Sequence, residues 1–267
     1  MDRIGVIKYN MSGMSMEEFL PWCSEKGVEY VELMRPDIWK DTGRKENRVK
    51  EVALLLRKYG IKVSQVAAGN DFVQPSPAGI EKELDNIREI CRMVKDLGGC
   101  QLRLDGGWNK DTVDEKFYKN MVIDGLSRAA EIGEKEGIYM ALDNHGKITN
   151  DYTLQLEAFG KIGSKYLGAN LDTLNYRWYG YPVEKLTDIY RQIAPYTLHT
   201  HLKDGVKADT DFKYTPAILG RGEIPLEKTI SILKDAGYTG PWCIEYEGKD
   251  GAAGYSECIR WLKEIKV

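Results

Sequence analysis

The stretch IYMALDNHGKITNDYTLQLEAFGKIGSKYLGANLD (138–172) contains one complete strand–helix–strand unit. Its two mainly apolar runs, 138–143 and 167–172, are typical of strands that are buried on both faces. A segment with helical periodicity, 151–162, lies between them. Units of this kind build parallel sheets whose faces are covered by helices.

The same alternation continues from one end of the chain to the other. Eight strands are predicted, over 3–8, 29–34, 62–67, 100–105, 138–143, 167–172, 196–201 and 242–246. Eight helices are predicted, over 15–26, 48–59, 79–97, 114–137, 151–162, 183–193, 225–236 and 254–266. Eight is the number of strands that closes a (β/α)8 barrel, the TIM barrel, so this α/β fold is our prediction.

A doubly wound open sheet is the alternative fold. It is less favoured because strands five to eight all end in acidic residues or histidine, whereas an open sheet places its site at one switch point. No linker, low-complexity tract or repeat divides the sequence, so we predict a single domain over 1–267. The longest segment outside the predicted elements, 205–218, is expected to form a loop over the barrel mouth.

The composition argues against several classes of protein. With 267 residues, of which 42% are hydrophobic, the chain can bury a large core. A formal charge of −3 argues against a nucleic-acid partner, and no apolar stretch approaches the length of a membrane span. The five cysteines are odd in number and lack zinc-motif spacing, which indicates free thiols and a cytoplasmic location. The oligomeric state is left open, and a homo-oligomer is compatible with the sequence.

Four consecutive predicted strands end in residues that bind divalent metals. These residues are Asp143, Asp172, His201 and Glu245, and in a barrel the carboxyl ends of the strands meet at one mouth. Three carboxylates in one pocket repel one another unless a cation joins them. The set of oxygen and nitrogen donors suits Mn²⁺, Mg²⁺, Co²⁺ or Zn²⁺. The sequence therefore predicts one divalent-metal site.

Neighbouring polar residues are candidates for substrate binding and proton transfer. Glu32 is expected to bind a substrate hydroxyl or to accept a hydrogen bond from a metal ligand, with pairing to Arg35 or Lys8 as the alternative. His145 is a candidate proton shuttle at the mouth. Lys203 is expected to neutralise an oxyanion or to pair with Asp204. His199 shares a strand face with His201, so it is a candidate for a substrate contact or for supporting a metal ligand.

Arginine and aromatic residues near strand ends complete the predicted pocket. Arg103 and Trp108 flank a glycine pair after strand four and are predicted to contact substrate, as is Arg221 through an anionic group. Further aromatic residues just beyond strand ends are candidates for a wall against a sugar ring: Trp39, Phe72 and Trp178. No glycine-rich phosphate loop is present, so a phosphorylated substrate is not predicted.

An ordered series of short motifs resembles the xylose-isomerase-like sugar phosphate isomerase/epimerase superfamily, which includes ketose 3-epimerases, inosose dehydratases and inosose isomerases. The resemblance covers essentially the whole chain and is strongest over 138–248. Its motifs are Asp-Asn-His-Gly (143–146), Asn-Leu-Asp-Thr-Leu-Asn (170–175), His-Thr-His-Leu-Lys-Asp (199–204), Leu-Gly-Arg-Gly-Glu-Ile (219–224) and Gly-Tyr-Thr-Gly-Pro-Trp-Cys-Ile-Glu-Tyr-Glu-Gly (237–248).

The resemblance implies a (β/α)8 fold and four metal ligands that fall on Asp143, Asp172, His201 and Glu245, with Mn²⁺ the favoured ion. In the family's epimerases the ligands on strands five and eight are both glutamates and also act as the acid/base pair. Strand five of this chain carries Asp143 instead, whose carboxylate is set back by about one C–C bond. We therefore expect Asp143 to bind metal and to be a candidate for proton transfer, with Glu245 favoured as the general base.

The implied activity is that of a metal-dependent isomerase or epimerase of a small-molecule carbohydrate or cyclitol. The general base removes a proton next to a carbonyl, and the metal stabilises the resulting enediolate. A lyase or dehydratase of a keto-inositol or 3-keto-glycoside is the nearest alternative, because it shares this first step. A non-catalytic sugar-binding subunit is another. A DNA-repair endonuclease of the same superfamily is disfavoured by the three histidines and the acidic charge.

Overall fold

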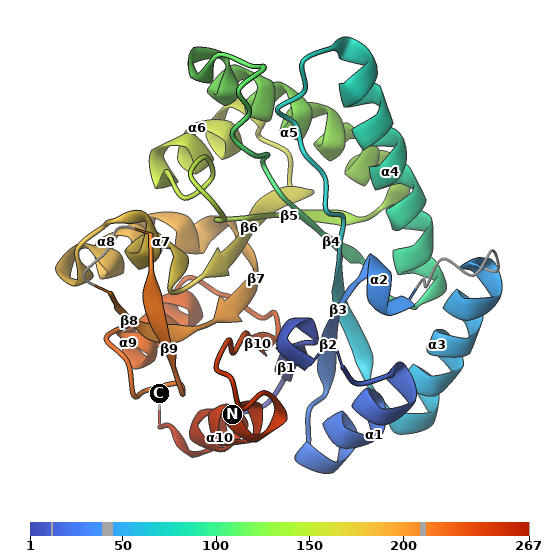
Figure 1. The fold of residues 1–267 in the computed structure, drawn as a ribbon, viewed down its shortest axis with the longest axis vertical. Coiled ribbons are helices and arrows are strands. Elements are labelled where there is room, and N and C mark those ends of the chain that lie inside the picture. The colour runs from blue at the N-terminus through green and yellow to red at the C-terminus, as the bar shows by residue number, and fades with distance from the viewer. Residues whose placement is uncertain (12, 39–44, 209–211, 267) are drawn as a thin grey trace.

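Eight parallel strands close into a barrel in the computed structural model, which describes residues 1–11, 13–38, 45–208 and 212–266 (Figure 1). Around the barrel the strands follow the order β1-β10-β7-β6-β5-β4-β3-β2, so the first and last barrel strands of the chain pair with each other. The predicted TIM barrel is confirmed. Its strands are β1 (Ile4–Ile7), β2 (Tyr30–Met34), β3 (Lys62–Ala67), β4 (Gln101–Leu104), β5 (Tyr139–Asp143), β6 (Leu167–Asp172), β7 (Thr197–Leu202) and β10 (Trp242–Ile244).

The helices form an outer layer around the strands, as Figure 1 shows. The main helices are α1 (Met16–Lys26), α3 (Lys45–Tyr59), α4 (Pro77–Asp96), α5 (Tyr118–Glu136), α6 (Tyr152–Ile162), α8 (Val183–Ile193), α9 (Leu226–Asp235) and α10 (Ala252–Glu264). These eight helices match the eight predicted segments, with ends that differ by a few residues. The remaining helical pieces are η1 (Tyr9–Met11), α2 (Arg35–Ile38), η2 (Glu115–Phe117), α7 (Asn175–Tyr179) and η3 (Ala194–Tyr196).

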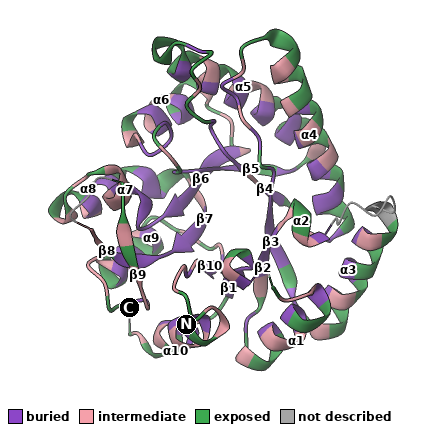
Figure 2. Ribbon diagram, viewed as in Figure 1, coloured by how far each residue is buried: buried purple, intermediate pink, exposed green. Residues whose placement is uncertain are grey.

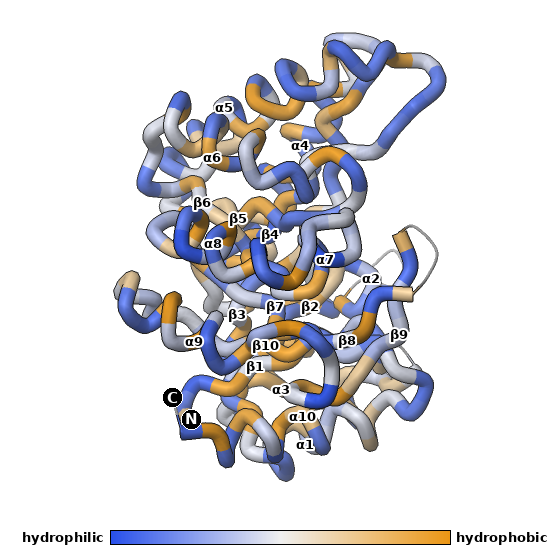
Figure 3. Tube along the Cα trace, turned by 90° about the vertical axis from the view of Figure 1, so that its left-hand side faces the viewer, coloured by the Kyte–Doolittle hydropathy of each residue, from blue (hydrophilic) through white to orange (hydrophobic). Residues whose placement is uncertain are grey.

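The core lies between the barrel and the helices. In Figure 2 the strands are largely buried, whereas the outward faces of the helices are exposed. The helix traces in Figure 3 alternate between hydrophobic and hydrophilic segments, as expected when one stripe of each helix packs on the barrel. Within the described part of the chain, no helix combines the length and the apolar character that a membrane crossing requires.

Two irregularities in strand pairing occur inside the barrel. Between β2 and β3 the register shifts after Val31, so that Glu32 lies opposite Gln65. Between β6 and β7 it shifts after Ala169, so that Asn170 lies opposite His199. Shifts of this kind leave one residue unpaired and redirect the side chains that follow. Here they place four polar side chains together in the barrel interior.

The segment predicted as a loop over the mouth contains an antiparallel hairpin, β8 (Asp204–Lys207) with β9 (Tyr214–Ala217). Its base is fixed by the buried carboxylate of Asp204. This carboxylate accepts backbone hydrogen bonds from Gly205, Gly220, Gly222 and Ile224 at 2.8–3.2 Å. The hairpin and the chain just before α9 are therefore held together at the side of the mouth.

Candidate active site

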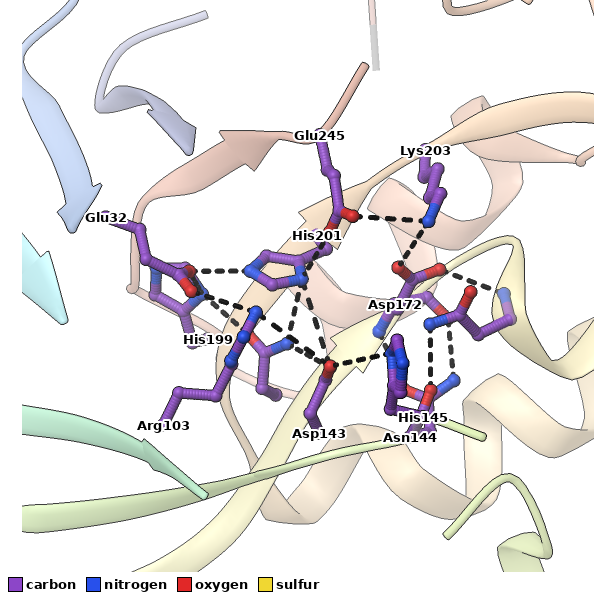
Figure 4. A network of polar contacts seen from close by, with 12 residues as sticks. Glu32, Arg103, Asp143, Asn144, His145, Asp172, His199, His201, Lys203 and Glu245 are labelled. Atoms are coloured by element: carbon purple, nitrogen blue, oxygen red, sulfur yellow. Dashed lines mark hydrogen bonds and ion pairs between the residues drawn. The ribbon is translucent and has the colours of Figure 1, made fainter. Parts of the chain in front are cut away.

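The four predicted metal ligands come together at the carboxyl ends of β5, β6, β7 and β10 (Figure 4). One possible ligand atom from each of Asp172, His201 and Glu245 lies within 4.8 Å of the others, and all three residues are buried. Asp143 is the fourth member, with its Oδ1 at 3.9 Å from Nδ1 of His201. The pairing of neighbouring strands produces this proximity. Asp172 on β6 is paired with His201 on β7, and His201 is paired with Cys243 on β10, two residues before Glu245.

Asp172 presents one carboxylate oxygen to the site without a hydrogen-bond partner among the described residues. Its Oδ1 accepts hydrogen bonds from the backbone N–H groups of Leu174 and Asn175 at 2.8 and 2.9 Å. Its Oδ2 is buried and accepts no hydrogen bond among the described residues. Burial raises the pKa of Asp172 to about 7, Lys203 opposes this change, and Glu245 adds to it. A cation bound at Oδ2 would relieve the cost of this isolated oxygen.

His201 lies between two carboxylates. Its Nδ1 is 2.9 Å from Oε2 of Glu245, and its Nε2 is 2.6 Å from Oε2 of Glu32. Although burial disfavours the charged ring, Glu32 and Glu245 raise the pKa of His201 well above its ordinary value. A carboxylate behind a ligating histidine fixes the ring so that the other nitrogen faces the metal. Glu32 is in the position to do this for Nδ1 of His201.

Glu32 is itself held from two sides. Nη1 of Arg103 is 3.1 Å from its Oε1, and Nε2 of Gln65 donates to its Oε2 at 2.7 Å. Burial works against the charge of Glu32, but His201 and Arg103 lower its pKa to about 2. Glu32 therefore accepts a hydrogen bond from a candidate ligand, which is one of the two roles predicted for it.

Lys203 lies on the other side of Glu245. Its Nζ is 3.2 Å from Oε1 of Glu245, 2.7 Å from Oε1 of Glu247 and 3.8 Å from Oδ2 of Asp172. Burial disfavours the charged form of Glu245, yet Lys203 and His201 hold the pKa of Glu245 well below its ordinary value. The hydroxyl of Tyr214 on β9 donates to Glu247, which brings the hairpin into this network.

These residues fit a divalent cation. Three carboxylates and one imidazole provide oxygen and nitrogen donors in the proportion that Mn²⁺, Mg²⁺, Co²⁺ and Zn²⁺ accept. Oδ2 of Asp172 accepts no hydrogen bond among the described residues, and Lys203 approaches it only to 3.8 Å. This is the observation in favour of a divalent cation, because a buried carboxylate oxygen otherwise finds a donor. The donor set does not choose among the four metals.

A cavity of about 410 Å³ opens beside the four residues. Trp108 and His145 form part of its wall, and their rings meet edge to face at 5.2 Å. The His145 side chain is 47% exposed and its Nδ1 is 3.7 Å from Oδ2 of Asp143, so it connects the site to solvent. The lining also includes Tyr9, Met34, Arg103, Asp105, Asp143 and Glu245.

Three residues predicted to bind substrate, Glu32, His199 and Arg221, do not line this cavity. His199 is fully buried below His201, with its Nδ1 at 2.7 Å from Oδ1 of Asn170, and burial lowers its pKa to about 3. It is therefore placed to support the site rather than to contact a substrate. Arg221 points outward and pairs with Glu257 at 2.7 Å, because the turn around it is fixed by Asp204.

The predicted aromatic wall is reduced to Trp108. Phe72 is fully buried against α5, and Trp178 packs against Phe212 with ring centroids 5.1 Å apart. Neither lines the cavity. Trp39 lies outside the described residues.

The sequence reasoning did not identify several polar residues of the site. They are Gln65, Asp105, Asn170 and Glu247. Three of them stand two positions from a residue that was singled out, on the same face of its strand: Asp105 after Arg103, Asn170 before Asp172, and Glu247 after Glu245. Extending the period of two along each strand would have found these three.

A closed parallel barrel with acidic and histidine side chains at its carboxyl edge defines a TIM-barrel protein with a candidate metal centre. Residues 20–265 match the family model described as xylose isomerase-like TIM barrel, and the chain belongs to this family. An inosose isomerase from Halalkalibacterium halodurans is 21% identical over 258 residues, which cover 93% of this chain and 89% of that protein.

Two solved structures share the fold over nearly the full length. The 3-DHS dehydratase AsbF of Bacillus anthracis, described as probable and as involved in petrobactin synthesis, has a TM-score of 0.82 at 14% identity, with 99% of this chain and all of that chain covered. The IOLI protein, described with a binding zinc atom, has a TM-score of 0.77 at 18% identity, with 98% and 95% covered.

Proposed function

We propose that this protein is a divalent-metal-dependent isomerase or epimerase of a sugar or cyclitol, and that it acts by removing a proton next to a carbonyl. The observation that carries the proposal is the buried cluster of Asp172, His201 and Glu245 beside a cavity of about 410 Å³, in which one Asp172 oxygen has no hydrogen-bond partner among the described residues. The inosose isomerase relative supports a cyclitol or sugar as the substrate class.

Asp143, Asp172, His201 and Glu245 are the residues that would hold the metal. A bound divalent ion supplies Lewis-acid polarisation of a carbonyl and of a neighbouring hydroxyl oxygen. Mn²⁺ remains the favoured ion, and the zinc described in the IOLI structure makes Zn²⁺ the first alternative. Glu32 orients His201 from behind through the 2.6 Å contact to Nε2.

Glu245 is the proposed general base. It lines the cavity, and Lys203 and His201 stabilise its ionised form, which is the form that can accept a proton. Lys203, whose Nζ lies 3.2 Å from Glu245, places a positive charge where an oxyanion develops. His145, half-exposed at the mouth, exchanges protons between the pocket and solvent.

A lyase reaction is the second candidate, and the likeness to the 3-DHS dehydratase structure is the observation that favours it. Both reactions begin with abstraction of the same proton. They differ in whether the electron pair then takes up a proton or expels a group from the next carbon. We also propose a cytoplasmic location, because the five cysteines are free and a reducing compartment maintains thiols.

The test begins with the metal content of the purified protein, measured by elemental analysis for the wild type and for Asp172→Ala. About one divalent ion per chain is expected in the wild type and a loss of it in the variant, as for a mononuclear site. The loaded protein is then incubated in D₂O with D-fructose, D-psicose, D-tagatose, D-sorbose and scyllo-inosose, and deuterium next to the carbonyl is followed by NMR. A wild type that takes up no Mn²⁺, Co²⁺ or Zn²⁺, or that exchanges no proton on any of these compounds, would contradict the proposal.

A further inference from the structure

A carboxylate that the proposed reaction does not use lies across the mouth from Glu245. Asp105 directly follows β4, and Glu245 directly follows β10. In the barrel order these two strands are opposite each other, with three strands between them on either side. Asp105 and Glu245 line the same cavity. A molecule in this cavity therefore has a carboxylate on each of two opposite sides.

The backbone of Asp105 is fixed, whereas its carboxyl group is free. The buried side chain of Asn70 accepts from the Asp105 N–H at 3.0 Å and donates to the Asp105 carbonyl at 2.6 Å. Asp105 is two residues beyond Arg103, and both residues line the cavity. The residue is 7% exposed, and no hydrogen bond or ion pair to its carboxyl group is found among the described residues. This is a rigidly placed carboxyl group that is available to a ligand.

Asp143, in contrast, is already engaged. Its Oδ1 accepts a hydrogen bond from Nδ2 of Asn170 at 2.6 Å and lies 3.9 Å from Nδ1 of His201. Its Oδ2 is 3.7 Å from His145 and 4.0 Å from Arg103. Both oxygens thus have neighbours within the site, and the side chain is one methylene shorter than that of Glu245. The free carboxyl group on this side of the cavity is that of Asp105.

We propose that Asp105 is the second proton-transfer residue, which acts on the face of the substrate opposite to Glu245. This inference rests on the proposed function and narrows it to epimerisation, because two carboxyl groups on opposite faces serve inversion at one carbon. Burial raises the pKa of Asp105 above its ordinary value, even though Arg103 opposes this.

Every proton and electron pair in this step is accounted for. The Glu245 carboxylate takes the proton from the carbon next to the carbonyl, and the C–H electron pair moves toward the carbonyl oxygen to give an enediolate. The pair then returns to the same carbon and forms a C–H bond with the proton of Asp105 on the other face. Glu245 ends protonated and Asp105 ionised, and both are restored by exchange with water. Nothing is oxidised or reduced.

The test compares Asp105→Asn with the wild type in D₂O, on the metal-loaded protein and the same five compounds. The wild type is expected to convert one epimer of a pair into the other and to place deuterium in the product. In Asp105→Asn, conversion should fall by about 10²-fold or more. Glu245 remains, so the variant should still exchange the proton of one epimer and not of the other. The conservative variant Asp105→Glu should restore part of the conversion.

Two controls separate a catalytic role from a structural one. Metal content and the thermal unfolding temperature of Asp105→Asn should equal those of the wild type, because Asp105 is not one of the four proposed ligands and its hydrogen bonds to Asn70 involve the backbone, not the carboxyl group. Asp124→Asn, an exposed change on α5, should behave as the wild type in every assay. Conversion by Asp105→Asn at the wild-type rate, or loss of exchange together with loss of metal, would overturn the inference. A wild type that exchanges nothing would instead overturn the proposed function, and the role of Asp105 with it.

Discussion

Replacement of Glu32 by glutamine should weaken metal binding even though Glu32 is not one of the four ligands. Its Oε2 is 2.6 Å from Nε2 of His201, and its Oε1 is 3.1 Å from Nη1 of Arg103. In Glu32→Gln only one of these positions keeps an oxygen. If the amide oxygen faces His201, the amide nitrogen opposes the Arg103 donor, and the reverse placement sets two donors against each other at His201.

The expected loss follows from the role of such partners at metal sites. Removal of a group that orients a ligating histidine typically costs about 10–100-fold in metal affinity. On the scale of 1.36 kcal/mol for each factor of ten, this is about 1.4–2.7 kcal/mol. The loss should occur without loss of the ligands themselves, so the number of metal ions bound at saturation should stay the same.

Isothermal titration of the metal-free protein with Mn²⁺ and with Zn²⁺ measures this effect. Glu25→Gln is the matched control, because the Glu25 side chain is 73% exposed and pairs with Lys26 at the protein surface. Circular dichroism and thermal unfolding verify that Glu32→Gln is folded. A dissociation constant within twofold of the wild type, in a folded variant, would refute the idea that Glu32 orients His201.

Three further outcomes are expected. Asp172→Asn should lose most of the bound metal in elemental analysis, because an amide replaces a charged carboxylate whose Oδ2 accepts no hydrogen bond among the described residues. Retention of one full equivalent of metal would exclude Asp172 as a ligand. Gly125→Ala should lower the free energy of unfolding measured in urea, because the added Cβ would meet the ring of Phe72. Overpacking of this kind costs about 1–3 kcal/mol, which exceeds the stabilisation of about 0.5–1 kcal/mol that alanine brings to a helix relative to glycine. Arg221→Ala should change neither metal affinity nor proton exchange, because its exposed ion pair with Glu257 lies outside the cavity and contributes about 0–1 kcal/mol to stability. A higher KM for substrate in this variant would show that Arg221 takes part in substrate binding.

The barrel was predictable because its signal repeats along the chain. Each strand is a mainly apolar run of three to six residues bounded by helical periodicity, and all eight lie within the segments expected from the sequence, give or take one residue at their ends. The short helices α2 and α7 were not predicted, because four or five residues are too few to show a period of 3.6. The hairpin β8–β9 was read as a loop, since its strands are short and pair only with each other.

The candidate ligands were predictable for a different reason, which is that strand ends converge in a barrel whatever the loops do. The course of the loops was not encoded in any local pattern. Arg221 faces solvent because Asp204 binds the backbone on both sides of it, a tertiary contact across 16 to 18 residues. The depth of His199 follows from a register shift between β6 and β7, which no periodicity in either strand indicates.

The two register shifts also bear on how such a barrel changes during evolution. Each leaves one residue without an opposite partner, Ser64 in β3 and Leu198 in β7, immediately before Gln65 and His199. Because side chains alternate along a strand, removal of either unpaired residue would turn the polar side chain that follows toward the helices. The interior hydrogen bonds to Glu32 and Asn170 are thus set by the length of two strands. Point substitutions around the mouth can adapt the pocket to new substrates. A deletion of Ser64 or Leu198 would instead remove the interior hydrogen bonds that hold the site from below.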